Sequence, residues 1–574
     1  MTERLGWGRG LALLGAISLA VYLYLALFVP GTMAYAPFSI QDDARQFHVW
    51  LPQLVDHGLL AGDPLAAYWR AMSPLAYRLP FALAADVGVD PVFFGRLLPV
   101  PLVALSLWAA WRLALKIAPD PRVAFFAAAL CFGYLIHDDA LFSATPRSFS
   151  HPLLLLALDA IVGRRPWWAA GWLTLLASLY PTTAVAGFGI FALAQAHRVI
   201  ERRPLRLAAN DWLPLAVGAL TVVLAMLPLQ QRAKAWGPVV TLAQALAMPN
   251  MNRITGRSSI VDASGHIGWV CSARVGYLPE ALPCDWGWTL ALPVNALLLV
   301  PLVVLAVRAA LGRPDPAAAE RNRVYLHALV ACTGCFVLAA LTAFALHFPG
   351  RYTQRILGPL EWLAIGQLIG LWLVGKPRAW SAGAVAVMLV VAATPMPGFV
   401  HPDPGLVRFV RTLPRTARLA GVAEELAVIP ALTGRAITAA PEQAIPWHMG
   451  YYAPFDRQLR LSLAAVSAPD QRGLAAAMLD SRADYLVVDR RLLAHSAIPE
   501  RYGRIDPDAV AEAQAELARG PSLVQRDAAR CALYRGPGVW VLDGKCLALA
   551  LPPPDPGLPS PARAGAGAEA GLRG

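Results

Sequence analysis

Two pairs of adjacent aspartates stand at corresponding places in the sequence, each just beyond a long apolar segment. Asp42 and Asp43 follow the first such segment, and Asp138 and Asp139 follow the third. A carboxylate can take a proton from an attacking hydroxyl, so two pairs in one pocket could divide into a base and an orienting acid. The oxygens of Asp42, Asp138 and Asp139 could instead hold a divalent cation such as Mg²⁺ or Mn²⁺. A third interpretation is that the pairs are two independent loop ends in water.

The first acidic pair is accompanied by a fixed cation and an imidazole. If residues 38–50 continue as a helix along the membrane surface, Asp42 and Arg45 share one face, and Arg45 and His48 are neighbours. Charged side chains beside membrane helices are costly to keep without a function. We therefore predict a functional site here, with Asp42 or Asp43 as the base and Asp42 preferred because it shares a face with Arg45. The alternative is that these acids only end a helix and meet water.

Three further arginines are candidates for holding an anion. Arg351 and Arg355 lie four residues apart between two apolar segments, and Arg147 lies in the loop of the second acidic pair. A guanidinium group binds phosphate oxygens in bidentate geometry. With Arg45 and His48, these arginines form the predicted phosphate-binding set. The alternative for Arg351 and Arg355 is the anchoring of lipid headgroups at the interface.

The elements that must position these side chains are membrane helices. Of the 574 residues 57% are hydrophobic and 15% charged, and the mean hydropathy is +0.49, which is too apolar for a soluble globular protein. The apolar runs are continuous, as membrane helices require, and do not alternate as barrel strands do. We predict about eleven membrane helices, at 11–29, 95–115, 122–136, 149–163, 166–180, 182–196, 212–228, 287–307, 325–347, 356–375 and 379–395.

Basic residues orient these helices. If the N-terminus is cytoplasmic, every short loop assigned to the inside is basic, as the positive-inside rule requires. The C-terminal region then lies outside, with outer loops at 30–94, 137–150 and 229–286. The net charge of +12 is spread over helix ends rather than one basic face, which argues against a nucleic-acid partner. The richness in Ala, Arg, Pro and Leu indicates a bacterial source, and therefore the inner membrane.

The composition divides the chain into three parts. Residues 1–397 form the predicted transmembrane catalytic module, 398–550 an extracytoplasmic α/β domain, and 551–574 a Pro/Gly/Ala-rich tail that is predicted to be disordered. In the α/β domain we predict helices at 415–429 and 471–481, a strand at 484–489, and a hairpin flanking residues 536–538. The domain has no phosphate-binding glycine loop, zinc spacing or nucleophile elbow, so we expect it to serve recognition or packing.

Four of the seven cysteines are disulfide candidates. Cys271 and Cys284 lie in the long outer loop, and Cys531 and Cys546 in the α/β domain, all on the side where disulfides can persist. The spacing leaves their connectivity open.

The arrangement of these features resembles the GT-C superfamily of polytopic membrane glycosyltransferases. That superfamily includes oligosaccharyltransferases and the mannosyl- and arabinosyltransferases that use polyprenyl-phosphate sugars. Asp42 and Asp43 match the position of its catalytic acid just beyond the first helix. Asp138 and Asp139 match the acid of the second outer loop, which is a metal ligand in some members. The soluble part carries no Trp-Trp-Asp sequence of the oligosaccharyltransferase type, and no subfamily is assigned.

The resemblance implies an enzyme that moves a sugar from a polyprenyl-phosphate carrier to a glycan, lipid or protein acceptor on the outer face of the membrane. The phosphate leaving group needs positive charge, and the acceptor hydroxyl needs a carboxylate, so one inverting displacement fits the residue types. Two alternatives stay open. A transporter or lipid flippase would use charge near the bilayer midplane and often internal repeats. A non-catalytic envelope scaffold would leave the acids without a function.

Overall fold

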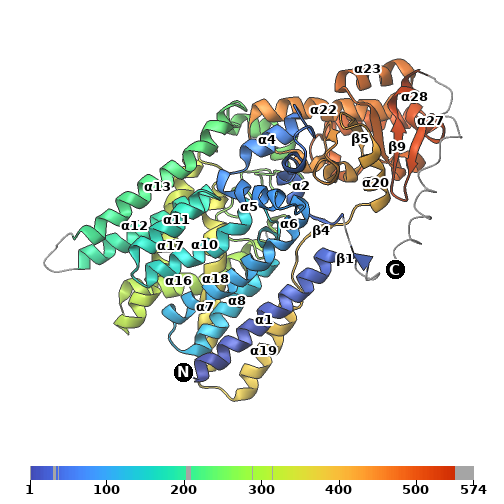
Figure 1. The fold of residues 1–574 in the computed structure, drawn as a ribbon. Helices are drawn as coiled ribbons and strands as arrows, with labels where there is room; N and C mark the ends of the chain where they lie inside the picture. The colour runs from blue at the N-terminus through green and yellow to red at the C-terminus, as the bar shows by residue number, and fades with distance from the viewer. Residues whose placement is uncertain are drawn as a thin grey trace.

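The computed structural model describes residues 2–29, 34–35, 38–201, 208–286, 289–312 and 315–549. The tail predicted to be disordered, 551–574, lies outside the described residues. The chain forms a long helical bundle with an α/β region against one end (Figure 1). The start of α1 lies at the opposite end of the bundle from that region.

Helices occur at all eleven positions predicted from the apolar runs. In chain order they are α1 (Thr2–Leu27), α7 (Pro99–Ile117), α8 (Pro121–His137), α10 (Ser150–Val162), α11 (Pro166–Ala177), α12 (Pro181–Glu201), α13 (Ala209–Lys234), α16 (Ala291–Leu311), α17 (Pro316–Leu341), α18 (Gly350–Leu373) and α19 (Arg378–Ala392).

These helices differ in whether they are long enough to cross a membrane. Among the described residues, seven helical stretches are long and apolar enough to span it, at the positions of α1, α7, α12, α13, α16, α17 and α18. The helices α8 and α19 are shorter. At 1.5 Å per residue, α10 with 13 residues and α11 with 12 extend only about 20 and 18 Å, less than the ~30 Å hydrocarbon core. The bundle therefore combines full spans with short helices.

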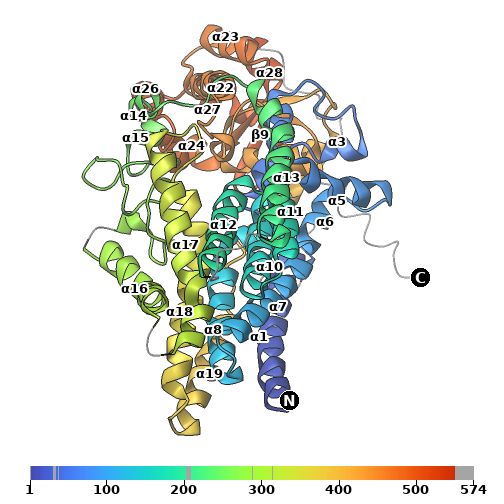
Figure 2. The same ribbon diagram turned by 90° about the vertical axis from the view of Figure 1, so that its left-hand side faces the viewer.

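The helices α8 and α18 run side by side through the middle of the bundle (Figure 2). Their contact is close because α18 presents glycines to α8, and a Cβ atom added at Gly370 would lie 2.7 Å from the Cα atom of Val123. Small residues let membrane helices approach in this way. The pairing matters for the site because the second acidic pair follows α8 and two of the candidate arginines begin α18.

The segment between α1 and α7 consists of short elements: β3 (Ile40–Gln41), α2 (Ala44–Phe47), α3 (Pro52–Val55), α4 (Pro64–Met72), α5 (Leu75–Asp86) and α6 (Pro91–Leu97). Residues 38–50 are therefore not one continuous helix as expected. Strand β3 pairs antiparallel with β4 (Phe399–Val400), the segment that follows the last bundle helix. This pairing joins the first loop to the start of the α/β region.

The α/β region contains a five-stranded mixed sheet in the order β6-β5-β7-β9-β8. Its strands are β5 (Arg418–Val422), β6 (Ala436–Ile437), β7 (Tyr485–Asp489), β8 (Ala532–Arg535) and β9 (Val539–Asp543). The pairs β5–β6 and β5–β7 are parallel, and β7–β9 and β8–β9 are antiparallel. Its larger helices are α20 (Pro404–Thr412), α22 (Met449–Ser467), α23 (Gln471–Ser481), α26 (Pro507–Arg519) and α27 (Leu523–Cys531).

Three of the four elements predicted in this region occur where the sequence placed them, namely α23, β7 and the β8–β9 hairpin. The helix predicted at 415–429 is wrong, because its first half is β5 and its second half a 3-10 turn, Glu424–Val428. The buried strand β5 has apolar residues on both faces, so its pattern does not alternate. Gly421 has φ +128°, and a Cβ there would meet the carbonyl of Val487.

The four candidate cysteines form two disulfides, Cys271–Cys284 in the long loop and Cys531–Cys546 in the α/β region.

Candidate functional site

A cavity of about 1800 Å³ lies where the bundle meets the α/β region. Its wall combines the first loop, the second loop, the long loop before α16, the turn between α17 and α18, and part of the α/β region. Both acidic pairs and three of the five predicted phosphate ligands line it: Asp42, Asp43, Asp138, Asp139, Arg147, Arg351 and Arg355. Segments that are far apart in the sequence therefore meet at one site.

The first acidic pair is fixed by the strand pairing between β3 and β4. The backbone N–H of Asp42 donates to the carbonyl of Gly398 at 2.9 Å, and Gly398 has φ +62°, which favours glycine. The side-chain oxygen of Gln41 accepts from the backbone N–H of Asp43 at 2.8 Å. The side chain of Asp42 is 41% exposed and that of Asp43 is 17% exposed. Asp42 is thus the more accessible acid of the pair.

Arg45 and His48, both predicted to bind phosphate, do not line the cavity. The guanidinium group of Arg45 is buried between Asp42 and Glu442, with 3.0 Å to the latter. The His48 ring is buried, and its Nε2 lies 3.3 Å from the carbonyl oxygen of Ala144. Burial lowers the pKa of His48 to about 4, so the ring is neutral near pH 7. Both residues hold the first loop in place rather than face a ligand.

Glu442 is a residue at this site that the sequence analysis missed. It lies in a turn of the α/β region, Pro441–Gln443, and is buried. Arg45 of the first loop and Arg257 of the long loop pair with it at 3.0 and 2.5 Å, and the Gln46 amide donates to it. Burial would raise the pKa of Glu442, but the charges of Arg257 and Arg45 lower it. One carboxylate therefore joins three segments beside the cavity.

The second acidic pair has two different environments. Asp138 accepts from the backbone N–H of Ala140 at 3.0 Å and forms an ion pair with Arg355. Burial would raise the pKa of Asp138, but the charges of Arg355 and of His151, 3.7 Å away, hold it below its ordinary value. Asp139 has no ion pair within the described part of the chain. Burial and the neighbouring Asp138 charge raise the pKa of Asp139 to about 6.

The arginines gather opposite these acids. Arg147 forms an ion pair with Asp43, as Arg355 does with Asp138. Arg351 is only 8% exposed, yet its guanidinium group has no ion pair or hydrogen bond to any described residue. Burial and the charges of Arg355 and Arg351 lower the pKa of Arg147, which places the three guanidinium groups close together. A group of buried cations with one uncompensated member fits an anionic ligand.

Two more residues of this group were not expected from the sequence. Tyr180, in the turn between α11 and α12, lines the cavity near the arginines. Burial would raise the pKa of Tyr180, but the charges of Arg351, Arg355 and Arg147 lower it. Arg274 of the long loop is a fourth guanidinium group in this neighbourhood. A tyrosine before a proline and an arginine in a long loop carry no sequence signal that would have identified them.

The predicted metal ligands do not assemble in this structure. In the part of the chain that is described, no three His, Cys, Asp or Glu side chains come together as a metal-binding group. Two members of the predicted set, Asp42 and Asp138, instead form ion pairs with Arg45 and Arg355.

The arrangement combines two capacities. Buried arginines that line the cavity can bind a phosphate and stabilise charge that develops on it. Carboxylates on the same wall can take a proton from a hydroxyl that enters beside that phosphate. Both capacities depend on the meeting of the first loop, the end of α8 and the start of α18.

A scan of protein-family models and a search of curated proteins found no match. Among solved structures, the chain is similar to the oligosaccharyltransferase AglB from Archaeoglobus fulgidus in complex with an inhibitory peptide and a dolichol-phosphate, with 11% identity and a TM-score of 0.49. That match covers 89% of this chain and 72% of the other. A structure of the A. fulgidus enzyme tethered to an acceptor peptide gives 11% identity, 88% and 72% coverage, and a TM-score of 0.46.

Proposed function

We propose that this protein is a membrane glycosyltransferase that moves a sugar from a polyprenyl-phosphate carrier to an acceptor hydroxyl. One observation carries the proposal: both acidic pairs and three arginines, from three separate segments, line a single cavity at the end of a membrane bundle. Within this group the buried Arg351 forms no ion pair or hydrogen bond with a described residue, although the charges of Asp138 and Asp139 act on it. A phosphate group can serve as its direct partner.

A lipid carrier fits the wall of the cavity better than a soluble nucleotide sugar. Part of the wall is made of apolar side chains from the bundle, including Leu130 of α8, Val185 of α12 and Met226 of α13. An apolar chain attached to the phosphate would lie along these helices, while the sugar would face the α/β region. A nucleotide would bring its polar base against the same apolar wall, at a cost in desolvation.

The proposed reaction is a single inverting displacement. The acceptor oxygen attacks C1 of the sugar, the bond between C1 and the phosphate oxygen breaks, and the phosphate leaves with the electron pair. Arg351, with Arg147 and Arg355, stabilises the negative charge on the leaving phosphate. The carboxylate of Asp42 takes the acceptor proton. Each acid of the first pair has an arginine partner, Arg45 for Asp42 and Arg147 for Asp43, and Asp42 is the proposed base because it is the more accessible of the two.

We also propose the orientation that the basic loops indicate. The start of α1 and the basic residues Lys116, Arg164 and Arg321 would face the cytoplasm. The cavity and both disulfides, near the other end of the bundle, would face the outside of a bacterial inner membrane. This orientation places the transfer on the outer face.

The experiment that tests the function measures transfer of radiolabelled sugar from a panel of polyprenyl-phosphate donors in membranes that contain the protein. The variants are Asp42→Asn, Asp43→Asn and Asp138→Asn. Asp262→Asn is the matched control, because Asp262 is a partly exposed aspartate of the long loop that does not line the cavity. We expect transfer by wild type and by the control, and loss of transfer in Asp42→Asn.

If wild type transfers from no donor while every variant still supports the same cellular phenotype, the glycosyltransferase proposal fails. A scaffold or a transporter then explains the protein better. If Asp43→Asn abolishes transfer and Asp42→Asn does not, the enzyme proposal stands and the assignment of the base is wrong.

A further inference from the structure

We propose that the loop closed by Cys271–Cys284 is part of the donor-phosphate site. It contributes Arg274 as a ligand and it positions the first turns of α18. The inference rests on the proposed function, because it assigns a role toward the phosphate of the same donor.

The loop is bonded to the beginning of α18, the helix that carries Arg351 and Arg355. The carbonyl of Arg274 accepts from the backbone N–H of Gly350 at 3.2 Å. The side-chain amide of Gln354 donates to the carbonyls of Ser272 and Gly276 at 2.7 and 3.1 Å. These bonds flank Arg351 on both sides along the helix. A shift of the loop would therefore move the start of α18.

The approach of the loop to α18 is too close for a side chain at its first residue. A Cβ atom added at Gly350 would lie 2.8 Å from the carbonyl oxygen of Gly276 and 2.9 Å from that of Arg274. Because the two backbones are in direct contact, a displacement of the loop would also displace the start of α18.

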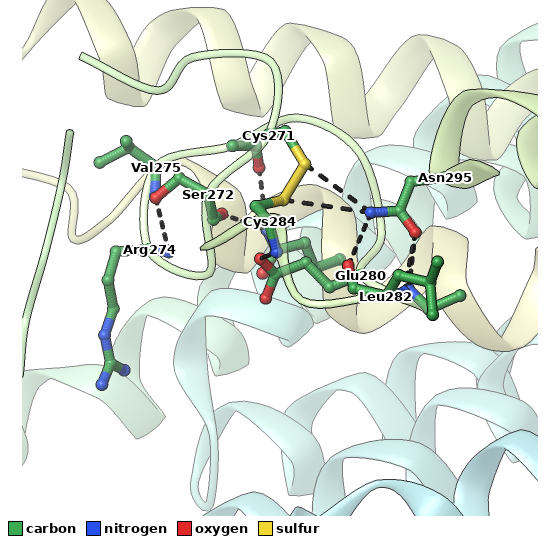
Figure 3. Close-up of a disulfide and its surroundings, with 11 residues drawn as sticks. Cys271, Ser272, Arg274, Val275, Glu280, Leu282, Cys284 and Asn295 are labelled. Atoms are coloured by element: carbon green, nitrogen blue, oxygen red, sulfur yellow. Dashed lines mark hydrogen bonds between the residues drawn. A yellow bond between two sulfur atoms is a disulfide. The ribbon is translucent and has the colours of Figure 1, made fainter. Parts of the chain in front are cut away.

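The base of the loop is held by the disulfide and by Asn295 of α16 (Figure 3). The buried Asn295 side chain accepts from the backbone N–H groups of Ala281 and Leu282 at 3.0 and 2.9 Å and donates to the carbonyl of Leu282 at 2.9 Å. Its amide nitrogen also lies 3.7 Å from the sulfur of Cys271. The disulfide thus closes the loop at the point where α16 anchors it.

The side chain of Arg274 extends from the loop on the side away from the disulfide (Figure 3) and lines the cavity. Its guanidinium group has no hydrogen bond or ion pair to any described residue. The carboxylate of Glu280 in the same loop attracts Arg274 but forms no ion pair with it, and it accepts from the backbone N–H of Cys284 at 3.3 Å. Arg274 and Arg351 are therefore two neighbouring arginines on this wall without an ion pair to a described residue, and a phosphate between them can bind both.

The test compares two double variants of the full-length protein. Cys271→Ser with Cys284→Ser opens the loop, and Cys531→Ser with Cys546→Ser removes the other disulfide, which lies away from the cavity. Both are assayed for sugar transfer and for binding of undecaprenyl phosphate and of inorganic diphosphate. We expect the first pair to raise the donor KM by about tenfold or more with a smaller change in kcat, because misplaced ligands weaken binding. We expect the second pair to leave the donor KM within about twofold.

Single variants keep the inference testable if the first double variant does not fold. Arg274→Gln should weaken diphosphate binding by about tenfold or more, and Arg274→Lys should recover part of it, since it keeps the charge. An unchanged donor KM and unchanged diphosphate binding in both Cys271→Ser/Cys284→Ser and Arg274→Gln would overturn the inference. If wild type binds diphosphate, Arg274→Gln does not, and no donor is turned over, the role of the loop stands and the proposed function fails.

Discussion

Replacing Arg351 by Gln should separate a ligand-binding arginine from a structural one. The guanidinium group of Arg351 is buried and has no ion pair or hydrogen bond in the described chain. The substitution therefore removes a phosphate ligand without leaving a protein partner unpaired. Hydrogen bonds to a charged group contribute about 1.5–3 kcal/mol, so we expect the affinity for a polyprenyl-phosphate donor to fall by about 10- to 150-fold.

The matched variant is Arg355→Gln, four residues further along α18. It leaves the side chain of Asp138, 9% exposed, without its counter-ion. Removing one partner of a buried ion pair costs about 3–5 kcal/mol of stability. Arg351→Gln should lose no stability, because it removes a cation that lies close to Arg147 and Arg355. The two variants should thus both lose affinity, and only Arg355→Gln should lower the melting temperature.

Donor affinity and thermal unfolding can be measured on the same detergent-solubilised samples. Titration with undecaprenyl phosphate gives the Kd, and intrinsic fluorescence gives the melting temperature. Two results would refute the reasoning. One is donor binding by Arg351→Gln with wild-type affinity, and the other is a melting temperature of Arg351→Gln lowered as far as that of Arg355→Gln.

Three further predictions follow from the same geometry. Because the pKa of Asp139 is raised to about 6, its carboxyl group loses a proton between about pH 5 and pH 7 and adds negative charge beside the arginines. The affinity for the donor should therefore fall over this pH range. Asp139→Asn should remove this pH dependence when the donor Kd is measured by titration. Glu442→Gln should destabilise the protein by about 3 kcal/mol, since it removes the buried carboxylate that Arg45 and Arg257 share, whereas the half-exposed Glu424→Gln should change the melting temperature little. If the N-terminus is cytoplasmic, Ser264→Cys in the long loop should react with a membrane-impermeant maleimide in spheroplasts, whereas Arg164→Cys should react only after the membrane is opened. The reverse pattern of labelling would invert the proposed orientation.

The sequence was sufficient to locate the acids and three of the arginines because their positions depend on local signals. Long apolar runs mark the helices, and the acids that follow the first and third runs must lie at the same end of the bundle. The alternating direction of successive helices is sufficient to place these residues at the same end. It placed Asp42, Asp43, Asp138, Asp139 and the α17–α18 turn on one side, and all of them line one cavity.

The remaining features depend on contacts between distant segments, which local patterns do not encode. The strand β3 forms only because β4, some 360 residues later, pairs with it, and this pairing replaces the helix expected at 38–50. For the same reason the spacing of Arg45 and His48 was misleading. Arg45 pairs with Glu442 of the α/β region, and His48 contacts a carbonyl of the second loop. A periodicity of three or four residues predicts neighbours on a helix, but it cannot predict which distant segment will cover them.

The arginine cluster is unfavourable in itself, and the structure around α18 explains how it persists. Close packing of Gly370 on α8 holds the helix from one side, and the disulfide loop holds its first turns from another. The turn that leads into α18 adds strain, because Ala343, Phe344 and His347 have positive φ values, at a cost of about 1–3 kcal/mol each. The ring of His347 lies against the ring of Trp447 of the α/β region, with the two ring centroids 4.4 Å apart, and this contact holds the turn in place. A bundle end that only needed to be stable would not place cations and a strained turn together. Their retention is explained if the fixed charges act on a ligand, since preorganised charge is what stabilises a departing phosphate.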